Sequence, residues 1–225
     1  MLILFKKIFF VFLKCMTTNI EKRDRLAMQL EEYLPEGFSI MVADLFLPIP
    51  VKFKIVNPRN TKLGDYRPAH NGQPHKITVN GNLNKYSFLI TTLHEFAHLH
   101  AHVAFGRTIQ PHGEEWKVCY RKLLLPVIDS KLLPKDVENA LVNSLVNTKA
   151  ASCSDIQLSR VLKNYDEQQD DIYLLENIPY KTKFILNGKT FIKGELRRKR
   201  FICEDVSSKK KYLVYAIAEV IPIFE

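Results

Sequence analysis

The chain has 225 residues, of which 46% are hydrophobic and 25% are charged. These values are ordinary for a globular protein, and they exclude a collagen-like, low-complexity or wholly disordered chain. The formal net charge is +9 at pH 7, but it is unevenly distributed. Residues 16–180 carry equal numbers of basic and acidic side chains, whereas residues 181–215 carry 11 basic and three acidic ones. The surplus therefore indicates an anionic partner for one C-terminal stretch rather than for the whole chain.

The N-terminal stretch of residues 1–18 is apolar and basic. Lys6, Lys7 and Lys14 interrupt it, and it is too short for a spanning helix of about 20 apolar residues. It also lacks the long apolar core of a signal peptide. Two interpretations remain, translation that starts at Met16 or a short membrane-surface anchor, and we favour the first. We expect no spanning membrane segment.

The cysteines contain no Cys-x-x-Cys pair, so the chain cannot build a four-cysteine zinc ribbon. Their wide spacing does not resemble a secreted disulfide framework, which favours free thiols in a cytoplasmic protein. The four residues are Cys15, Cys119, Cys153 and Cys203.

The first part of the chain alternates between helical and extended patterns. A segment at 38–47 is apolar and fits either a helix or a strand, and 57–75 is rich in Pro, Gly, Asn and His and is expected to be a loop. The remaining predicted elements are helices at 19–34, 87–105, 113–125 and 134–146 and strands at 51–56 and 77–79. Pro126 is expected to end the third of these helices.

After residue 150 the pattern changes. A short helix to Lys163 and the acidic tract 166–171 form a predicted connection over 151–171, and 172–225 is predicted to be a basic, all-β subdomain. The dipeptide Asn187-Gly188 is a strong signal for a two-residue hairpin. The predicted strands are 183–186, 190–193, 197–204 and 212–218.

The segment His94-Glu95-Phe96-Ala97-His98 lies within the helix predicted at 87–105. Two residues four apart on a helix lie about 40° from each other around the axis, so both imidazoles can reach one metal ion. Glu95, next to His94, can reach a water on that ion. This is the arrangement of a zinc hydrolase in which Glu95 is the general base that activates the zinc-bound water.

A catalytic zinc ion usually has three protein ligands and one open position, so a third ligand must come from elsewhere. Ala104 occupies the place of a third histidine in the metzincin pattern. Glu114 or Glu115 is conceivable, but both follow very closely, and His112 is the better candidate. His102 could substitute, and surface or core positions are favoured for His70, His75, His100 and His102. Trp116 is expected to anchor the following helix in the core.

The stretch Leu93–Lys117, with His-Glu-Phe-Ala-His, Phe-Gly-Arg and Pro-His-Gly-Glu-Glu-Trp-Lys, resembles the SprT-like zinc metalloprotease family. Thr61-Lys62-Leu63-Gly64-Asp65-Tyr66-Arg67 and Ile77-Thr78-Val79-Asn80 resemble bacterial members. The family includes bacterial SprT proteins, sometimes given a transcription-elongation label, and the eukaryotic Spartan proteases, which cleave proteins crosslinked to DNA.

The resemblance implies that His94, His98 and His112 bind one catalytic Zn²⁺ and that Glu95 is the catalytic base. It implies an α+β fold: a zincin-like minimal metalloprotease core at 19–150, a small sheet with active-site helices, before the all-β subdomain. Many members end in a four-cysteine ribbon, which this chain lacks. Tyr66 is a candidate for oxyanion or substrate contact, with a packing role equally favoured.

The basic C-terminal strands are candidates for DNA or RNA contact, because basic side chains track phosphates and interleaved aromatic rings can stack on bases. The alternative is a solvated strand face whose aromatic residues form a small core. The candidate contacts are Lys193, Arg197, Arg198, Lys199, Arg200, Lys209, Lys210 and Lys211. We therefore expect a zinc metalloendopeptidase that acts on nucleic-acid-associated proteins. The alternative is a non-catalytic nucleic-acid- or transcription-associated binding protein with a structural or vestigial zinc site.

Overall fold

The computed structural model describes residues 19–59, 61–146, 155–167 and 171–224. Within it the chain divides into two compact units, with the boundary between Tyr165 and Asp166. The expectations for residues 1–18, including the start at Met16, lie outside the described residues, as do Cys15 and Cys153. Each unit is described below by itself.

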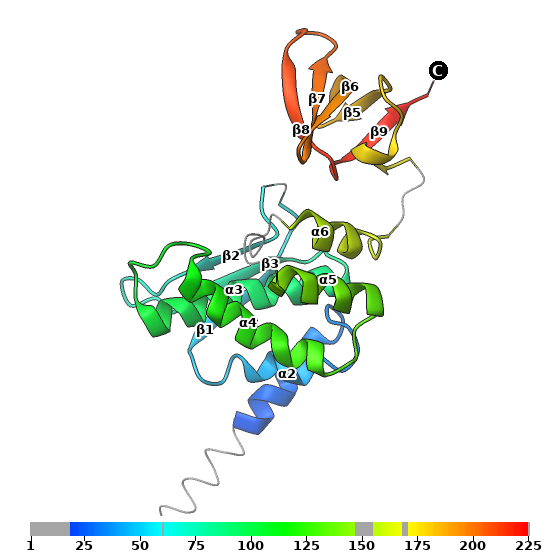
Figure 1. Ribbon diagram of the computed structural model, residues 1–225. Coiled ribbons are helices and arrows are strands. Elements are labelled where there is room, and N and C mark those ends of the chain that lie inside the picture. Colours follow the sequence, from blue (N-terminus) through cyan, green and yellow to red (C-terminus); the bar gives the residue numbers. More distant parts are fainter. Residues whose placement is uncertain (1–18, 60, 147–154, 168–170, 225) are drawn as a thin grey trace, which may run out of the picture. The chain divides into compact units, whose positions relative to one another are not determined.

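The first unit contains a three-stranded mixed sheet (Figure 1). Its strands are β1 (Val51–Val56), β2 (Gly64–Arg67) and β3 (His75–Asn80), in the order β1-β3-β2. β3 pairs with β1 in parallel and with β2 antiparallel, so β2 is an edge strand. β2 lies in the segment expected to be a loop, and that part of the expectation is wrong. Its four residues form a strand only because β3 supplies the partner.

Helices make up most of the rest of this unit. Residues 19–30 are helical, and the ambiguous segment 38–47 forms a short helix. This short helix is α2 (Ser39–Asp44). The remaining helices are α3 (Lys85–Phe105), α4 (Glu114–Asp129), α5 (Lys135–Val146) and α6 (Ile156–Lys163).

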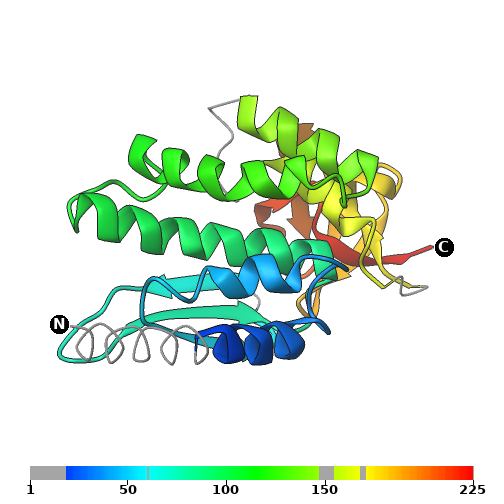
Figure 2. The same ribbon diagram turned by 90° about the horizontal axis from the view of Figure 1, so that it is seen from below.

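The long helix α3 runs through the core between the sheet and α4 (Figure 2). Apolar side chains surround it on several sides, as expected of a helix covered on both faces. Asn84 caps its start by accepting a hydrogen bond from the Ser87 N–H at 2.9 Å, and Gly106 ends it with a φ of 85°. Glycine adopts that left-handed conformation without a steric penalty. The fully buried residues of α3 include Phe88, Leu89, Phe96 and Leu99.

Helix α4 continues through Pro126 to Asp129, beyond its expected end. A proline inside a helix removes one backbone hydrogen bond and normally disfavours continuation. Here Val127 and Ile128, directly after the proline, are buried in the core of the unit. We attribute the continuation to this burial, which offsets the lost hydrogen bond.

The second unit is an antiparallel sheet in the order β4-β9-β5-β6-β7-β8 (Figure 1). The hairpin at Asn187-Gly188 is confirmed, with φ of 50° and 73° between β5 and β6. The strand expected at 212–218 ends at Tyr215, where a turn follows, and a further strand that was not expected begins at Glu219. The elements are β4 (Tyr173–Leu174), η1 (Leu175–Asn177), β5 (Lys183–Leu186), β6 (Lys189–Arg197), β7 (Arg200–Asp205), β8 (Lys211–Tyr215) and β9 (Glu219–Ile223).

The architecture is thus α+β in the first unit and all-β in the second. Cys119 and Cys203 are buried free thiols. Among the described residues, the longest apolar helices fall short of what a membrane crossing requires.

Candidate metal and catalytic site

Two of the candidate ligands come from one face of α3. His94 is buried at 6% exposure and His98 is half-buried one turn further along. The four-residue spacing places their Nε2 atoms 3.2 Å apart, as the helical geometry predicts. Both histidines therefore sit on a rigid element in the centre of the unit.

His112 comes from the turn before α4. Its φ is 62°, a left-handed conformation that is uncommon outside glycine and in which histidine is enriched. The Gly113 N–H donates to the Gln110 carbonyl at 2.9 Å and closes this turn. The turn brings the His112 Nε2 to 3.0 Å from that of His94 and 3.1 Å from that of His98. A sparsely populated backbone conformation at this point fits a side chain held for function.

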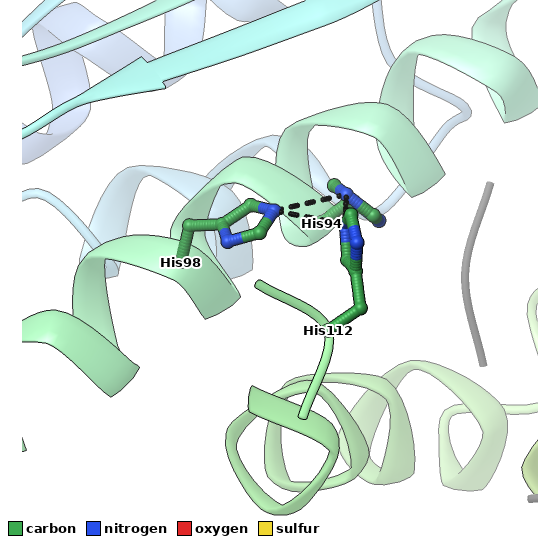
Figure 3. A group of neighbouring side chains, drawn as sticks. All are labelled: His94, His98 and His112. Carbon is green, nitrogen blue, oxygen red and sulfur yellow. Dashed lines mark hydrogen bonds between the residues drawn. The ribbon is translucent and has the colours of Figure 1, made fainter. Parts of the chain in front are cut away.

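The three imidazoles converge on one point (Figure 3). Two ligand nitrogens of a tetrahedral zinc ion lie about 3.3 Å apart, given a Zn–N distance of about 2.05 Å. The observed spacings of 3.0–3.2 Å are close to this edge length. His94, His98 and His112 can thus hold a metal ion.

The electrostatics of the triad suit metal binding. Burial, together with the neighbouring imidazoles, lowers the pKa of His94 to about 3 and that of His98 to about 4. Burial also lowers the pKa of His112. The rings are therefore neutral near pH 7, and a neutral imidazole is the form that binds metal.

Trp116 packs beneath the triad. Its ring centroid lies 4.7 Å from that of His94, 5.4 Å from that of His98 and 4.8 Å from that of His112. The side chain is 1% exposed, in agreement with the predicted anchoring role. Because Trp116 is on the first turn of α4, this contact also fixes the turn that carries His112.

Glu95 follows His94 on α3 and is 6% exposed. Burial, with a further contribution from the negative charge of Asp65, raises the pKa of its carboxyl to about 7. The charge of Arg59 and a hydrogen bond from the Tyr66 backbone N–H stabilise the carboxylate and so act in the opposite direction, toward a lower pKa. A carboxyl with a pKa near neutrality is suited to accept and return a proton.

Tyr66 lies on β2, beside the triad. Its ring is parallel to that of His98 within 3°, with centroids 6.3 Å apart. Its hydroxyl is 2.9 Å from the Nδ1 of His75, which also accepts the backbone N–H of Ala69. Since Nδ1 is an acceptor in that second contact, the Tyr66 hydroxyl is the donor in the first. Burial raises the pKa of Tyr66 to about 12, so the phenol stays protonated.

The other candidates lie outside the triad. His102 contacts the rings of Tyr66 and His75, and exposed His70 belongs to a small turn. Glu114 pairs with Lys117 at 2.7 Å on the surface. Within the described part of the chain, the triad is the one group of three or more His, Cys, Asp or Glu side chains that are spaced to hold a metal ion.

The basic side chains of the second unit form two groups rather than one. Arg197–Arg200 lie at the β6–β7 turn, and Lys209–Lys211 lie at the other end of β7. Phe191 and Phe201 are buried, which fits the alternative of a small aromatic core, whereas Tyr212 is exposed.

Lys193 does not belong to either basic group. It is 5% exposed, and its ammonium donates to the carbonyls of Glu176 at 3.1 Å and Ile178 at 2.6 Å. It also lies over the Phe201 ring at 4.2 Å. The prediction of Lys193 as a nucleic-acid contact is therefore corrected: its head group ties two segments of the unit together.

Sequence reasoning missed two residues near the catalytic candidates. Gly64 touches Glu95, and Arg59 organises the chain before β2. Both lie in the stretch interpreted as a loop. The glycine directly before Asp65 and Tyr66 was the available signal, because a glycine in an extended segment often marks a close approach.

The fold and the triad together define a small α+β domain in which three histidines can hold a metal ion. Residues 41–130 match the SprT-like family. This region of the chain is therefore similar to the SprT-like family.

Individual relatives cover only parts of the chain. Protein SprT of Pseudomonas fluorescens strain SBW25 is 38% identical over 96 residues, which is 39% of this chain and 58% of the relative. Protein SprT of P. fluorescens strain Pf-5 is 61% identical over 31 residues, or 14% and 19% of the two chains. Protein SprT of Pseudomonas savastanoi pv. phaseolicola is 56% identical over 39 residues, or 17% and 24%. The chain thus matches less than two thirds of the length of these relatives. No solved structure matches it.

Proposed function

We propose that the first unit is a zinc-dependent metallopeptidase with a zincin-like core. The observation that supports this most is the convergence of three neutral imidazoles within 3.0–3.2 Å, next to a buried carboxyl. A purely structural metal site has no use for Glu95 in that position. We assign His94, His98 and His112 as the ligands of one Zn²⁺, with His112 as the third.

When bound, the zinc ion would supply Lewis-acid chemistry, which polarises a carbonyl and lowers the pKa of a water. Glu95 has the complementary task of taking the proton and returning it to the leaving amine. Such general acid–base assistance is typically worth about 10²–10⁴ in rate. The burial that raises the Glu95 pKa also limits the access of competing water to the carboxyl.

The edge strand β2 offers a place for the substrate. An extended peptide can add to an exposed sheet edge through main-chain hydrogen bonds. β2 lies directly against α3, where the Tyr66 ring is stacked on that of His98, so a peptide along β2 would pass the histidine triad. For Tyr66 to assist an oxyanion there, its hydroxyl would have to leave His75.

Glu95→Gln tests the enzymatic proposal. We expect the variant to retain zinc, measured by atomic absorption, and to lose at least about 100-fold in hydrolysis of dye-labelled casein. Undiminished hydrolysis would remove Glu95 from its role as base. A wild-type protein that binds no zinc would overturn the metal site itself.

The second candidate function is nucleic-acid binding by the second unit. It is supported by four consecutive basic residues, Arg197–Arg200, at the exposed β6–β7 turn, with the Arg200 guanidinium 5.5 Å from the Tyr215 ring centroid. This function combines with the first as targeting to nucleic-acid-associated proteins, in a cytoplasmic setting. It stands alone if Glu95→Gln leaves every measured property unchanged.

A further inference from the structure

The Glu95 side chain lies in very close contact with the backbone of the edge strand. A Cβ atom added to Gly64 would lie 2.5 Å from the Glu95 Oε1, 2.8 Å from its Cγ and 2.8 Å from the Thr91 Cγ2. Gly64 does not have a positive φ, so its conformation does not require glycine. The requirement comes instead from space: β2 packs so closely on α3 that no side chain fits between the strand and the carboxyl.

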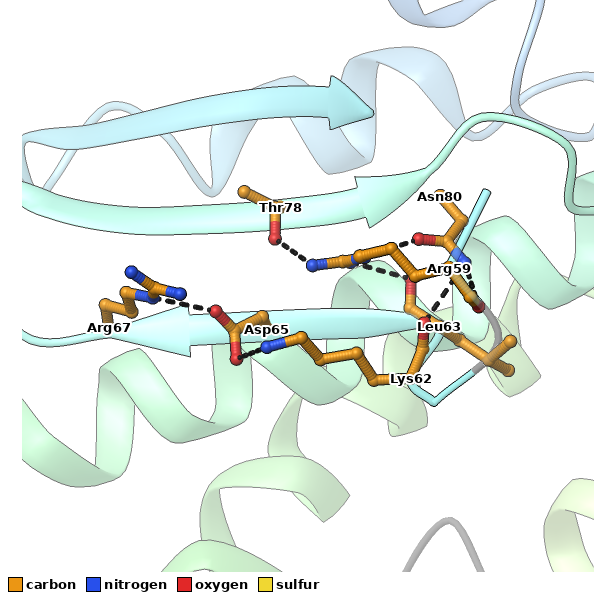
Figure 4. A network of polar contacts seen from close by, with 7 residues as sticks. All are labelled: Arg59, Lys62, Leu63, Asp65, Arg67, Thr78 and Asn80. Carbon is orange, nitrogen blue, oxygen red and sulfur yellow. Dashed lines mark hydrogen bonds and ion pairs between the residues drawn. The ribbon is translucent and has the colours of Figure 1, made fainter. Parts of the chain in front are cut away.

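The chain directly before Gly64 is held by Arg59 and Asn80 (Figure 4). The Arg59 guanidinium donates to the Asn80 Oδ1 at 2.8 Å, to the Thr78 Oγ1 at 3.1 Å and to the Leu63 carbonyl at 3.5 Å. We call this set of contacts the Arg59 clamp.

Asn80 completes the clamp from β3. Its side-chain amide donates to the carbonyls of Arg59 at 3.2 Å and Lys62 at 3.0 Å, and its backbone N–H donates to the Leu63 carbonyl at 2.9 Å. Asn80 is 2% exposed and Thr78 is 6% exposed. Buried polar groups of this kind need their partners, so loss of the guanidinium leaves them unsatisfied.

The clamp therefore fixes the end of β3 to the residue that immediately precedes Gly64. The position of β2 in turn sets where Gly64 limits the carboxyl and where the Tyr66 N–H donates to it. We propose that Arg59 is a positioning residue for the general base: through Asn80 and Leu63 it holds β2 against Glu95. This inference rests on the proposed role of Glu95.

A planar guanidinium suits this task because it presents several donors in a fixed fork. Lysine would keep the charge near Glu95 but could not reach the three acceptors together. The pair Arg59→Lys and Arg59→Met therefore separates geometry from charge. Arg25→Met is the matched control, because Arg25 is an exposed arginine on the helix at 19–30 and its loss changes the net charge equally.

The first measurement is hydrogen exchange of the Tyr66 amide in the full chain, followed by NMR. We expect Arg59→Met to raise its exchange rate at least about tenfold, because the partner carboxylate and strand separate. Arg59→Lys should show a smaller rise in the same direction, and Arg25→Met none. The amides of Ile77 and Val79 on the central strand serve as an internal reference, since general destabilisation would raise them as well.

The second measurement is casein hydrolysis by the same zinc-loaded variants. We expect Arg59→Met to lower kcat by about 10- to 100-fold, as displacement of a reacting group by about 1 Å does, with KM and zinc content within twofold of wild type. Gly64→Ala should act in the same way, because its Cβ displaces the carboxyl directly.

The outcomes separate this inference from the proposed function. Undiminished hydrolysis by Glu95→Gln would overturn the function, whatever Arg59 does. An unchanged Tyr66 exchange rate in Arg59→Met would overturn the positioning role, and so would a rise shared equally by Ile77 and Val79. The exchange measurement needs no catalysis and decides the inference by itself.

Discussion

Replacement of His112 is the sharpest test of the three-histidine site. Alanine is a poor choice, because the φ of 62° would strain it, whereas asparagine tolerates the left-handed region. His112→Asn therefore keeps the turn and removes one ring nitrogen from the triangle of 3.0–3.2 Å contacts. His94 and His98 remain as a two-histidine site on α3.

The expected magnitude follows from binding linkage. Zinc at 100 times its Kd stabilises the wild-type fold by about 2.7 kcal/mol. For a unit of this size that corresponds to a rise in Tm of about 5–11 °C. Loss of even an outer partner of a metal ligand weakens affinity by about 10–100-fold, so loss of a ligand should weaken it by at least about 100-fold. At the same zinc concentration, zinc should then stabilise the fold of His112→Asn by only about 0.4 kcal/mol, which raises its Tm by about 1–2 °C.

The assay is thermal unfolding followed by tryptophan fluorescence, with and without Zn²⁺. Trp116 is the single tryptophan of the chain and contacts all three rings, so the signal reports on the first unit alone. His70→Ala is the control, because His70 is an exposed histidine outside the triad. Equal zinc stabilisation of His112→Asn and wild type would refute His112 as a ligand. An equal loss of zinc stabilisation in His70→Ala would show that the effect is not specific to the triad.

Three further outcomes are expected. The metal-free protein should lose stability as the pH falls from 7 to 5. The reason is that His94 is protonated near pH 6.5 in the unfolded chain but only near pH 3 in the folded chain. Denaturant titrations should show a loss of about 2 kcal/mol in the free energy of unfolding from His94 alone. Pro126→Ala should raise the Tm of the first unit, since it restores one helical hydrogen bond at an exposed position, and an unchanged or lower Tm would contradict this explanation. Arg197→Ala with Arg198→Ala should lower the salt slope of DNA binding by about 2, measured by fluorescence anisotropy between 50 and 200 mM salt, whereas an unchanged slope would place the contact elsewhere.

Much of the site follows from local sequence pattern. The four-residue spacing of His94 and His98 specifies their common face as soon as the segment is known to be helical. His112 lies close after Gly106 in the sequence, so a turn there can return the chain toward α3. The structure shows the turn, but its left-handed residue is His112 itself, and no periodicity indicates that conformation.

The basic segment shows where a count along the sequence fails. Alternation of basic and apolar residues does not say which end of a strand a turn occupies, and here β7 separates the two basic groups. Lys193 illustrates a further limit. Its burial follows from the bulge after it in β6 and from the carbonyls of Glu176 in η1 and of Ile178 directly after η1, which precede it by 17 and 15 residues. Such contacts depend on tertiary structure rather than on local propensity.

The missed strand β2 joins the fold to the chemistry. A four-residue segment that contains Gly64 and follows one proline and two asparagines has little intrinsic β-propensity. It is extended because β3 pairs with it and because Arg59 and Asn80 hold the residues directly before it. The glycine that weakens the strand signal is also what allows the strand to approach Glu95. The local sequence departs from a regular strand at the point where the proposed general base must be held, and this is where a functional constraint is expected to override local preference.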